Sequence, residues 1–355
     1  MELVIFGAQA IALGTYNAIK ELYPDCNIEC FLVTSLDNNP KTLAGLQVEE
    51  LYAYSENHSI NYKENILVII ATPENVMNVI EETLRENKFT NIHRLDSIEW
   101  ARLQEKYYTN NKIFQTFNQY NTGSAKPQIK VFMAKFWKDK PLTSIEAVPE
   151  YMVPIQVGTA LTDVRVADIL DNVGDNISAQ NGNYSELTAL YWIWKNAVVD
   201  NSYYGLAHYR RFLMLTDTEL SKLQGDNIDV VLPYPMPYEP SMEMHRKRYL
   251  AQSEWNAVLQ ALEELYPEYG VALQKISNQK YMYNYNIFVA KGNVLNQYCE
   301  WLFTILFRVE EINNPCRTNT PNRYLGYIAE TLETLFFMYN KDKFKIVHTG
   351  CRFLT

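Results

Sequence analysis

Short apolar runs alternate with longer amphipathic stretches through the N-terminal third of the chain. Four apolar runs have the length and composition of buried strands: residues 3–6, 28–34, 66–71 and 91–95. Amphipathic stretches at 10–22 and 74–87 carry apolar residues at helical spacing. Because strands that alternate with helices form parallel sheets, this region is expected to fold as a Rossmann-like unit.

The glycine turn after the first strand is a degraded form of the dinucleotide-binding fingerprint. The pattern G-x-G-x-x-G would place glycines at 7, 9 and 12, whereas the chain has Gly7, Gln9 and Ala12. Gln9 carries a side chain at the point where the backbone has to approach a pyrophosphate. We therefore expect a structural or oligomerisation module here, with dinucleotide binding as the alternative.

A second α/β unit follows a segment that lacks apolar periodicity. Residues 117–127 are rich in turn formers, which predicts a Rossmann-like domain at 1–122 and a second domain at 123–355. In the second domain we expect strands at 129–134, 151–158, 203–207, 229–232 and 281–290, and helices at 294–312 and 323–339. The proline-punctuated segment 233–240 is long enough to form a lid over a binding site.

The stretch from 172 to 211 carries the clearest functional signal. It begins with a loop rich in Gly, Asn, Asp and Ser, whose side chains hydrogen-bond nearby backbone. Asn183 and Glu186 then have the spacing of a capping box at the start of a helix. The buried strand at 203–207 ends in His208-Tyr209-Arg210-Arg211. A strand that brings a pair of cations to its C-terminal end predicts an anion site.

These motifs resemble the bacterial family known as domain of unknown function 4422. The similarity lies in G-D-N-I-S, N-Y-x-E-L-T-A-L-Y-W-x-W-K-N and Y-Y-G-L-x-H-Y-R-R-F, and it continues in Y-N-I-F-V, Y-C-E-W-L-F and R-Y-L-G-Y-I-A-E. It covers about residues 129–355. The family occurs in gene clusters for capsule, exopolysaccharide and O-antigen synthesis, and some members are galactofuranosyltransferases. The resemblance implies an α/β protein whose second domain is like the A-type glycosyltransferases and uses a nucleotide diphosphosugar.

Sugar transfer requires a stabilised leaving diphosphate, a base for the acceptor hydroxyl and side chains that hold the sugars. The candidates for binding the diphosphate and the donor sugar are His208, Tyr209, Arg210, Arg211, Lys195, Asn176, Asn183, Tyr184 and Glu186. Glu330 is the first candidate for the catalytic base and Asp175 the second, while Asn286 and Arg323 are candidates for binding the acceptor. Gly326, inside the same predicted helix as Glu330, suggests a close approach by another group.

No Asp-x-Asp motif stands where an A-type transferase would have its metal ligands. Asp226-Asn227-Ile228-Asp229 has the wrong spacing and opens a strand, whereas His208-Tyr209-Arg210 occupies the expected place. We therefore assign no metal ligand and expect arginines to stabilise the charge, with Mn²⁺ or Mg²⁺ as an open alternative. The family often has His-Lys at the end of the first strand of this domain, but here the residues are Ala134-Lys135.

Composition narrows the class of protein. A net charge of −9 argues against a dedicated nucleic-acid binder, because there is no basic excess to neutralise phosphates. The five cysteines are scattered and odd in number, which favours free thiols in a reducing compartment. Neither a signal peptide nor a run of about 20 apolar residues is present. We expect a cytoplasmic protein, with peripheral contact at the inner face of the membrane left open, since polysaccharide acceptors often sit on lipid carriers.

The leading hypothesis is an inverting glycosyltransferase for surface polysaccharide. Its expected partners are a UDP-sugar donor, with galactofuranose suggested by the resemblance alone, and an oligosaccharide or lipid-linked acceptor. Two other functions stay open: a nucleotide-sugar oxidoreductase that uses the N-terminal domain, and a non-catalytic sugar-binding assembly protein. The degraded glycine fingerprint counts against the oxidoreductase. A homo-oligomer is a further open alternative.

Overall fold

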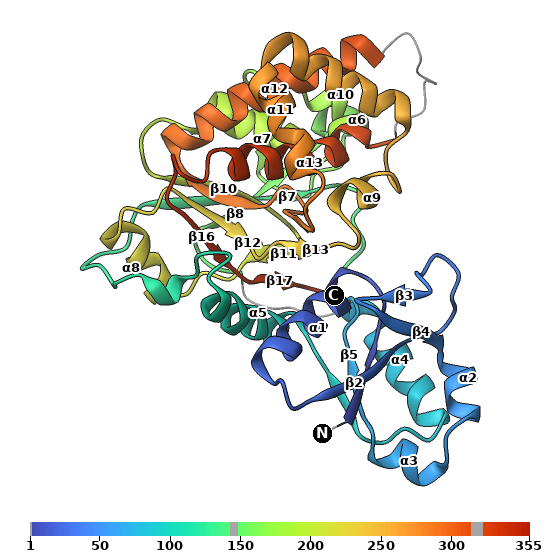
Figure 1. The fold of residues 1–355 in the computed structure, drawn as a ribbon. Coiled ribbons are helices and arrows are strands. Elements are labelled where there is room, and N and C mark those ends of the chain that lie inside the picture. Colours follow the sequence, from blue (N-terminus) through green and yellow to red (C-terminus); the bar gives the residue numbers. More distant parts are fainter. Residues whose placement is uncertain (1, 143–147, 314–321) are drawn as a thin grey trace.

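The computed structural model describes residues 2–142, 148–313 and 322–355. These residues form a mixed α/β structure with a six-stranded sheet, a nine-stranded sheet and a two-stranded ribbon. Figure 1 shows a smaller N-terminal lobe built on the first sheet and a larger lobe built on the second. The predicted fold class, a Rossmann-like α/β unit followed by a second α/β unit, is confirmed. The exact boundary between the units, at 122/123, stays a prediction.

The first sheet has the strand order β3-β4-β2-β1-β5-β6 and is parallel except where β3 pairs with β4. Its strands are β1 (Glu2–Phe6), β2 (Asn27–Val33), β3 (Thr42–Leu43), β4 (Leu46–Glu50), β5 (Leu67–Ile70) and β6 (Ile92–Arg94). The strands are connected by α1 (Ala10–Leu22), α2 (Leu51–Glu56), α3 (Ile60–Asn65) and α4 (Glu74–Glu86), and α5 (Ser97–Asn111) follows. Because β1 lies between β2 and β5, the strand order reverses at its carboxyl end, where such sheets bind ligands.

The second sheet has the order β16-β12-β15-β10-β7-β8-β9, with β11 and β17 attached beside β10. Its strands are β7 (Ile129–Lys135), β8 (Met152–Gln156), β9 (Ile169–Leu170), β10 (Tyr203–His208), β11 (Arg211–Leu213), β12 (Val230–Pro233), β15 (Phe288–Lys291), β16 (Ile346–Thr349) and β17 (Cys351–Phe353). β15 runs antiparallel to both of its neighbours, β10 and β12. The central strands β10 and β15 are almost entirely buried, since helices or loops cover both faces of the sheet.

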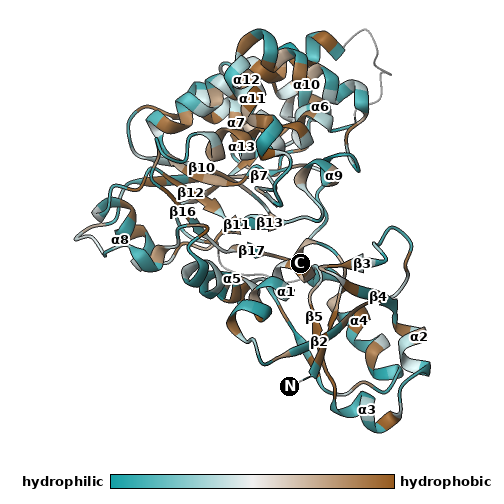
Figure 2. Cartoon of the chain, in the orientation of Figure 1, coloured by the Kyte–Doolittle hydropathy of each residue, from teal (hydrophilic) through white to brown (hydrophobic). Residues whose placement is uncertain are grey.

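Helices cover one face of the second sheet, as Figure 1 shows. They are α6 (Asn181–Tyr184), α7 (Leu187–Trp192) with a π-helical turn (Ile193–Ala197), α10 (Gln252–Leu265), α11 (Pro267–Ile276), α12 (Gly292–Asn313) and α13 (Tyr324–Tyr339). The opposite face is covered partly by α8 (Asp217–Gly225). Figure 2 shows hydrophobic residues along the strands and polar residues along the outward helix faces, the pattern that amphipathic helices require. Trp301 of α12 is buried in this core.

The two lobes share a packed boundary. Tyr108 of α5 donates its hydroxyl to the carbonyl of Pro235 at 3.2 Å. The backbone N–H of Phe353 in β17 donates to Ser97 Oγ at 3.1 Å. Tyr234 belongs to the same buried cluster as β1, β2 and α1, so the hydrophobic core of the first lobe continues into the second.

Two expected features of the second domain differ in the structure. The predicted strand 281–290 is broken into β14 (Tyr281–Met282) and β15, because Tyr285 and Asn286 take left-handed backbone conformations between them. The predicted lid at 233–240 contains β13 (Met236–Pro237), which pairs with β14. Residues 233–237 are buried at the boundary between the lobes, so this part of the segment is a fixed wall.

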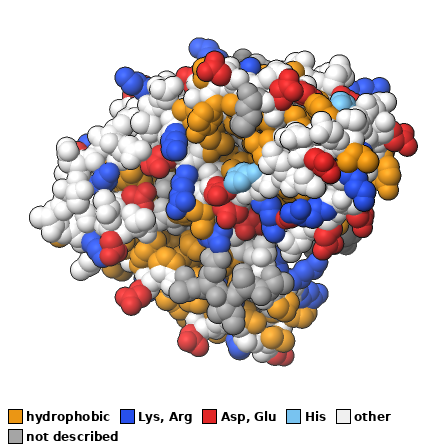
Figure 3. Space-filling view, turned by 90° about the horizontal axis from the view of Figure 1, so that it is seen from below, with side chains coloured by type: hydrophobic (Ala, Val, Ile, Leu, Met, Phe, Trp, Pro, Cys, Tyr) orange, Lys and Arg blue, Asp and Glu red, His pale blue; other side chains and the backbone are white. Residues whose placement is uncertain are grey.

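The helices, cysteines and surface charges of the described residues have the following properties. None of the described helices is long and apolar enough to cross a membrane. Among the described cysteines, Cys26, Cys30, Cys299 and Cys351 are free thiols, and Cys316 lies outside the described residues. Acidic and basic side chains are interspersed on the coloured part of the face in Figure 3, without a broad field of one sign.

Candidate functional site

A cavity of about 440 Å³ lies at the C-terminal ends of β7 and β10. It is lined by Ala134, Phe136, Asp139, Val157, Asn181, Gly182, Ser185, Glu186, His208, Tyr209, Arg210, Arg211 and Arg323. The parallel pairing of the two strands, with His208 in register with Ala134, puts their ends together at this edge. The four polar residues from His208, the end of β10, to Arg211, the start of β11, therefore all line one cavity.

Two of the guanidinium groups at this cavity have few protein partners. Arg210 donates to the carbonyl of Lys140 at 3.1 Å, and its buried Nε has no hydrogen-bond partner among the described residues. Arg211 lies over the ring of Tyr285, 4.4 Å from its centroid. A guanidinium group with unused N–H donors is suited to bind phosphate oxygens.

Glu186 lies between a third arginine and a buried amide. Its Oε1 accepts a hydrogen bond of 2.7 Å from Asn286 Nδ2, and its Oε2 lies 3.9 Å from Arg323 Nη2. Arg323 also donates to Ser185 Oγ at 2.9 Å. The predicted capping box of Asn183 and Glu186 is therefore wrong. α6 ends at Tyr184, Glu186 is the residue before α7, and its carboxylate binds Asn286 rather than the backbone of Asn183.

His208 presents a free nitrogen at this edge of the sheet. Its buried Nε2 has no hydrogen-bond partner in the described part of the chain. Burial lowers the pKa of the imidazole. Arg211 lowers this pKa further, and the opposing effect of Glu186 is smaller than that of burial. The ring is therefore neutral at pH 7, and its Nε2 can accept or donate a hydrogen bond according to the tautomer.

Glu330 opens into an adjoining cavity of about 190 Å³. This acceptor-side chamber, as we call it below, is lined by Tyr238, His245, Arg246, Tyr249, Leu250, Met282, Asn284, Tyr285, Tyr327, Glu330 and Thr331. Glu330 Oε2 accepts from Asn284 Nδ2 at 3.2 Å. Burial, together with the Glu186 carboxylate, raises the pKa of Glu330 to about 7 against the lowering effect of Asn284 and Arg211. A carboxylate with this pKa can take up a proton near neutral pH.

A second acidic residue lies behind Glu330 on α13. Glu333 is fully buried, and neither of its carboxyl oxygens has a hydrogen-bond partner among the residues that the structure describes. Burial raises its pKa well above the usual range, and Glu330 and Glu186 add to that effect. The folded protein therefore favours the neutral form of the Glu333 carboxyl group.

Unusual backbone conformations gather around these side chains. Ser185, Tyr285, Asn286 and Arg323 all have positive φ angles, between 50° and 76°. The backbone of Tyr285 interacts with both the His208 imidazole and the Glu330 carboxylate. A residue other than glycine adopts a positive φ angle only at a cost in free energy. Such strained residues are common at functional sites. The break between β14 and β15 thus places the backbone of Tyr285 between His208 and Glu330.

A buried carboxylate fixes the wall of the cavity beyond β8. Asp171 is fully buried and accepts hydrogen bonds from the backbone N–H groups of Gly158 and Thr159, at 2.8 and 3.0 Å, and from the hydroxyl of Thr188 at 2.7 Å. Gly158 has φ +64°, and a Cβ there would come within 2.9 Å of Asn181 Cγ. Only glycine fits this turn without displacing a residue that lines the cavity.

Comparison with known proteins shows the family to which the chain belongs. The profile of the domain of unknown function DUF4422 matches residues 138–341, more than half of the chain. The chain belongs to this family. The matched range contains Glu186, Arg210, Arg323 and Glu330, so the charged residues of both cavities are part of the DUF4422 domain. No curated protein matches the chain.

One solved structure is similar to this DUF4422 protein: the WbbM bifunctional glycosyltransferase in its apo form. The two chains are 27% identical over the match, with a TM-score of 0.56. The match covers 64% of this chain and 45% of that chain, so it spans less than half of the larger protein. Together with the family match, this likeness supports a glycosyltransferase-like protein.

Not all of the predicted site residues of the DUF4422 domain lie at the cavities. Those that line them are Glu186, His208, Tyr209, Arg210, Arg211, Arg323 and Glu330, and Asn286 contacts Glu186 from behind. Asp175 is exposed and accepts from the Tyr191 hydroxyl at 3.1 Å, outside both cavities. Asn176, Asn183, Tyr184 and Lys195 also line neither cavity.

Local contacts explain these placements. Asn176 donates to the carbonyl of Gly174 at 2.8 Å, within its own turn. The hydroxyl of fully buried Tyr184 donates to Glu310 at 3.0 Å. Lys195 lies over the ring of Trp194, 3.5 Å from the centroid.

Sequence reasoning missed Asp139 at the cavity. Asp139 lines the cavity and accepts from the backbone N–H of Phe136 at 2.7 Å. An Asp three residues after the aromatic residue that follows β7 is a turn signal that could have drawn attention to it. Another group does approach the backbone at Gly326, since Asn286 Nδ2 donates to the Gly326 carbonyl at 3.2 Å. A Cβ at this position would meet Ser185 and Glu186 at 3.9 Å, an ordinary contact distance.

The residues that the structure describes do not offer the ligand set of a Mn²⁺ or Mg²⁺ site. The described residues contain no group of three or more His, Cys, Asp or Glu side chains that could hold a metal ion. The carboxylates lining the 440 Å³ cavity are Asp139 and Glu186, and both already have partners in the protein. The function proposed below therefore includes no step that runs through a metal.

Proposed function

We propose that this DUF4422 protein transfers a sugar from a nucleotide diphosphosugar to a hydroxyl group of a glycan acceptor. The observation that carries the proposal is the position of Glu330. Burial raises the pKa of Glu330 to about 7. Arg211 and Tyr285, which contact each other, lie between Glu330 and the cavity that the arginines line. A proton acceptor next to an anion site is the combination that glycosyl transfer needs.

The arginine-bordered cavity is the proposed donor site. Arg210 and Arg211 would bind the diphosphate and stabilise the negative charge that grows as it leaves. Arg323 and Glu186, joined across the cavity wall, would hold hydroxyl groups of the transferred sugar, with Asn286 fixing Glu186. His208 Nε2, which lacks a partner among the described residues, would supply one further hydrogen bond to the donor.

The acceptor-side chamber is the proposed place of the reacting hydroxyl. Glu330 would take the proton from this hydroxyl while its oxygen forms a bond to the anomeric carbon. The bond from that carbon to the diphosphate oxygen breaks, and its electron pair leaves with the diphosphate toward Arg210 and Arg211. Because Glu330 and the arginines line different cavities, attack and departure on opposite faces of the sugar are favoured, which inverts the configuration.

The finer parts of the proposal rest on the resemblance to polysaccharide-synthesis proteins. The donor would be a UDP-sugar, with galactofuranose as one candidate, and the acceptor an oligosaccharide or lipid-linked glycan of a surface polysaccharide. Such an acceptor would place the protein in the cytoplasm, in peripheral contact with the inner face of the membrane.

The rival functions receive less support from the structure. Gln9 of the first domain donates to Asn39 Oδ1 and accepts from Arg248, both at 2.9 Å. Its side chain is therefore held at the place where a dinucleotide pyrophosphate would bind, which counts against an oxidoreductase. A raised pKa on a carboxylate that faces a cavity favours a reactive group over a purely sugar-binding protein.

The pH dependence of transfer tests this function. Purified protein would be incubated with a panel of nucleotide diphosphosugars and glycan acceptors, and nucleotide release and product would be measured from pH 5 to 9. Since the base must be deprotonated, kcat/KM should rise about tenfold per pH unit below pH 7 and level off above it. The absence of any transfer or slow donor hydrolysis would reject the proposal, and a product with retained configuration would reject the role of Glu330.

A further inference from the structure

A second cavity, of about 390 Å³, lies between the two domains. On the first domain it is bordered by Gln9, in the turn between β1 and α1, and by Thr42 of β3. This is the carboxyl end of β1, where the strand order of the first sheet reverses. On the second domain it is bordered by Tyr238, Arg248 and Lys280. We call it the interdomain cavity.

The interdomain cavity and the acceptor-side chamber share two wall residues, Tyr238 and His245. Their rings are stacked, with centroids 3.6 Å apart. The Tyr238 hydroxyl lies 3.2 Å from Asn284 Oδ1, and Asn284 Nδ2 donates to Glu330 Oε2 at 3.2 Å. One tyrosine therefore borders the interdomain cavity and connects, through a single amide, to the proposed base. Tyr238 and His245 thus form the boundary between the acceptor-side chamber and the interdomain cavity.

The walls of the interdomain cavity suit a neutral polar ligand. Lys280 is paired with Glu239 at 2.9 Å, and Glu239 also accepts the backbone N–H of Ala44 across the domain boundary at 2.6 Å. Arg248 donates to Gln9. Lys280 is thus paired with a carboxylate and Arg248 is hydrogen-bonded to an amide, and the Glu239 carboxylate would repel a phosphate. Amide and guanidinium groups beside a stacked pair of aromatic rings are suited to sugar hydroxyls and sugar ring faces.

We propose that the interdomain cavity binds the sugar units of the acceptor glycan that precede the reacting unit, so that the first domain contributes to recognition of longer acceptors. The proposal rests on the function proposed above for the acceptor-side chamber. It gives the Rossmann-like domain a role in place of dinucleotide binding. A short acceptor would contact only the acceptor-side chamber, whereas a longer one would also contact Gln9 and Thr42.

Direct binding without a donor tests the proposal. The probes are a disaccharide and a longer oligosaccharide, both prepared from the surface polysaccharide of the source organism, and calorimetry measures their Kd. Thr42 is exposed, so Thr42→Trp should fill the cavity without unfolding the protein. The matched control is Val79→Trp, an exposed position on α4 that borders none of the cavities described above. Equal melting temperatures for the variants and the wild type check the fold, and Gln9→Ala is a second variant that removes a wall group.

Thr42→Trp should raise the Kd of the longer oligosaccharide about tenfold, a change of about 1.4 kcal/mol, and leave that of the disaccharide unchanged. Gln9→Ala should act in the same direction and Val79→Trp should have no effect. Failure of the wild type to bind the longer oligosaccharide more tightly than the disaccharide would overturn the proposal, as would an unchanged Kd in Thr42→Trp. Binding that Thr42→Trp weakens, in a protein that transfers no sugar, would reject the proposed function and leave the interdomain site standing.

Discussion

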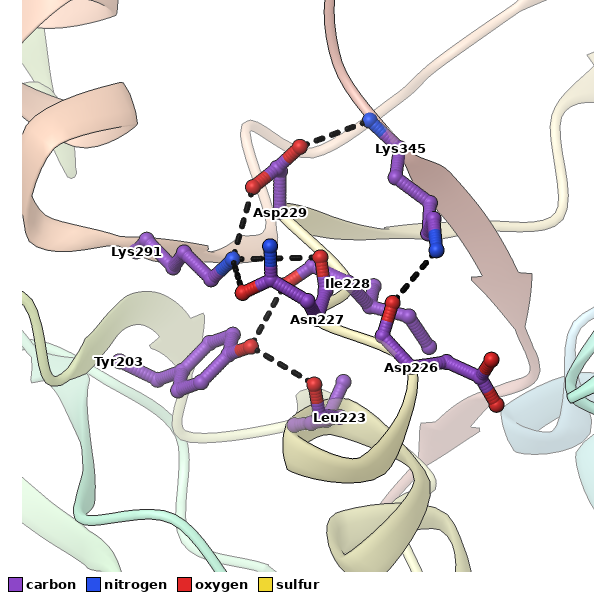
Figure 4. A network of polar contacts seen from close by, with 8 residues as sticks. All are labelled: Tyr203, Leu223, Asp226, Asn227, Ile228, Asp229, Lys291 and Lys345. Atoms are coloured by element: carbon purple, nitrogen blue, oxygen red, sulfur yellow. Dashed lines mark hydrogen bonds and ion pairs between the residues drawn. The ribbon is translucent and has the colours of Figure 1, made fainter. Parts of the chain in front are cut away.

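The two ends of β10 differ in how fully their polar groups are used. At the end where the strand begins, Figure 4 shows a closed network. The Tyr203 hydroxyl donates to the carbonyls of Leu223 and Ile228. Lys291 binds Asn227 Oδ1 at 2.6 Å and Asp229 at 2.8 Å. Lys345 completes the network in Figure 4, since its backbone N–H donates to Asp229 and its ammonium group to the carbonyl of Asp226.

At the end where β10 stops, buried polar atoms are left over. His208 Nε2, Arg210 Nε and Asn286 Oδ1 have no hydrogen-bond partner among the described residues. Buried polar atoms in folded proteins are nearly all hydrogen-bonded, so several unused ones in one place indicate a ligand site. At one edge of the sheet, called the saturated edge below, the polar groups are hydrogen-bonded to one another and hold the strands in register. At the opposite, unsaturated edge, buried polar atoms are left without partners among the described residues and could bind a ligand.

The largest expected effect comes from Glu330→Gln at the unsaturated edge. The substitution keeps the shape of the side chain but removes the proton acceptor. Transfer should therefore fall by about 10²–10⁴-fold, the usual contribution of a positioned base. The melting temperature should not fall, because a carboxyl group with a raised pKa does not stabilise the fold at neutral pH. Steady-state rates and thermal melts check both parts, and full activity in the variant would remove Glu330 from the reaction.

Lys291→Met at the saturated edge should show the opposite pattern. It leaves the partly buried Asp229 and the Asn227 side chain without their main donor. The free energy of unfolding should fall by about 1–3 kcal/mol, measured by denaturant titration. KM for the donor should be unchanged in the folded protein. A variant with lost activity and unchanged stability would mean that the contrast between the two edges is wrong.

The smallest expected effect is a gain in stability from Glu333→Gln. The pKa of Glu333 is higher in the folded than in the unfolded protein. Its contribution to the free energy of unfolding is therefore fully present below pH 4.5 and is lost as the pH rises. Replacing it with an amide of similar shape removes this loss. The melting temperature of the variant should therefore exceed that of the wild type more at pH 8 than at pH 4. An increase of equal size at both values would show that Glu333 is not held as a neutral acid.

The sequence alone could predict those features of the two ends of β10 that depend on the local pattern of apolar and polar residues. The apolar run at 203–207 predicted a buried strand, and the four polar residues after it lie at one cavity because a strand ends at one edge of its sheet. The alternation of strands and helices likewise predicted the Rossmann-like arrangement of the first sheet.

Contacts between distant segments could not be predicted in this way. The spacing of Asn183 and Glu186 fits a capping box, but Glu186 binds Asn286, a hundred residues further along the chain. The break in the predicted strand at Tyr285 and Asn286 depends equally on tertiary structure, because Glu186 and Glu330 interact with this bend. Asn readily adopts the left-handed region, but nothing in the local pattern selects that conformation.

Ligand binding by three proteins tests the central claim most directly. Wild type, Arg210→Ala and Lys291→Met would be melted with and without each of a panel of nucleotide diphosphosugars and NAD(H). At 100 times its Kd a ligand adds about 2.7 kcal/mol of stability. We predict that a nucleotide diphosphosugar raises the melting temperature of wild type and Lys291→Met by similar amounts and that of Arg210→Ala far less. Equal stabilisation of Arg210→Ala, or stabilisation by NAD(H) alone, would contradict the account.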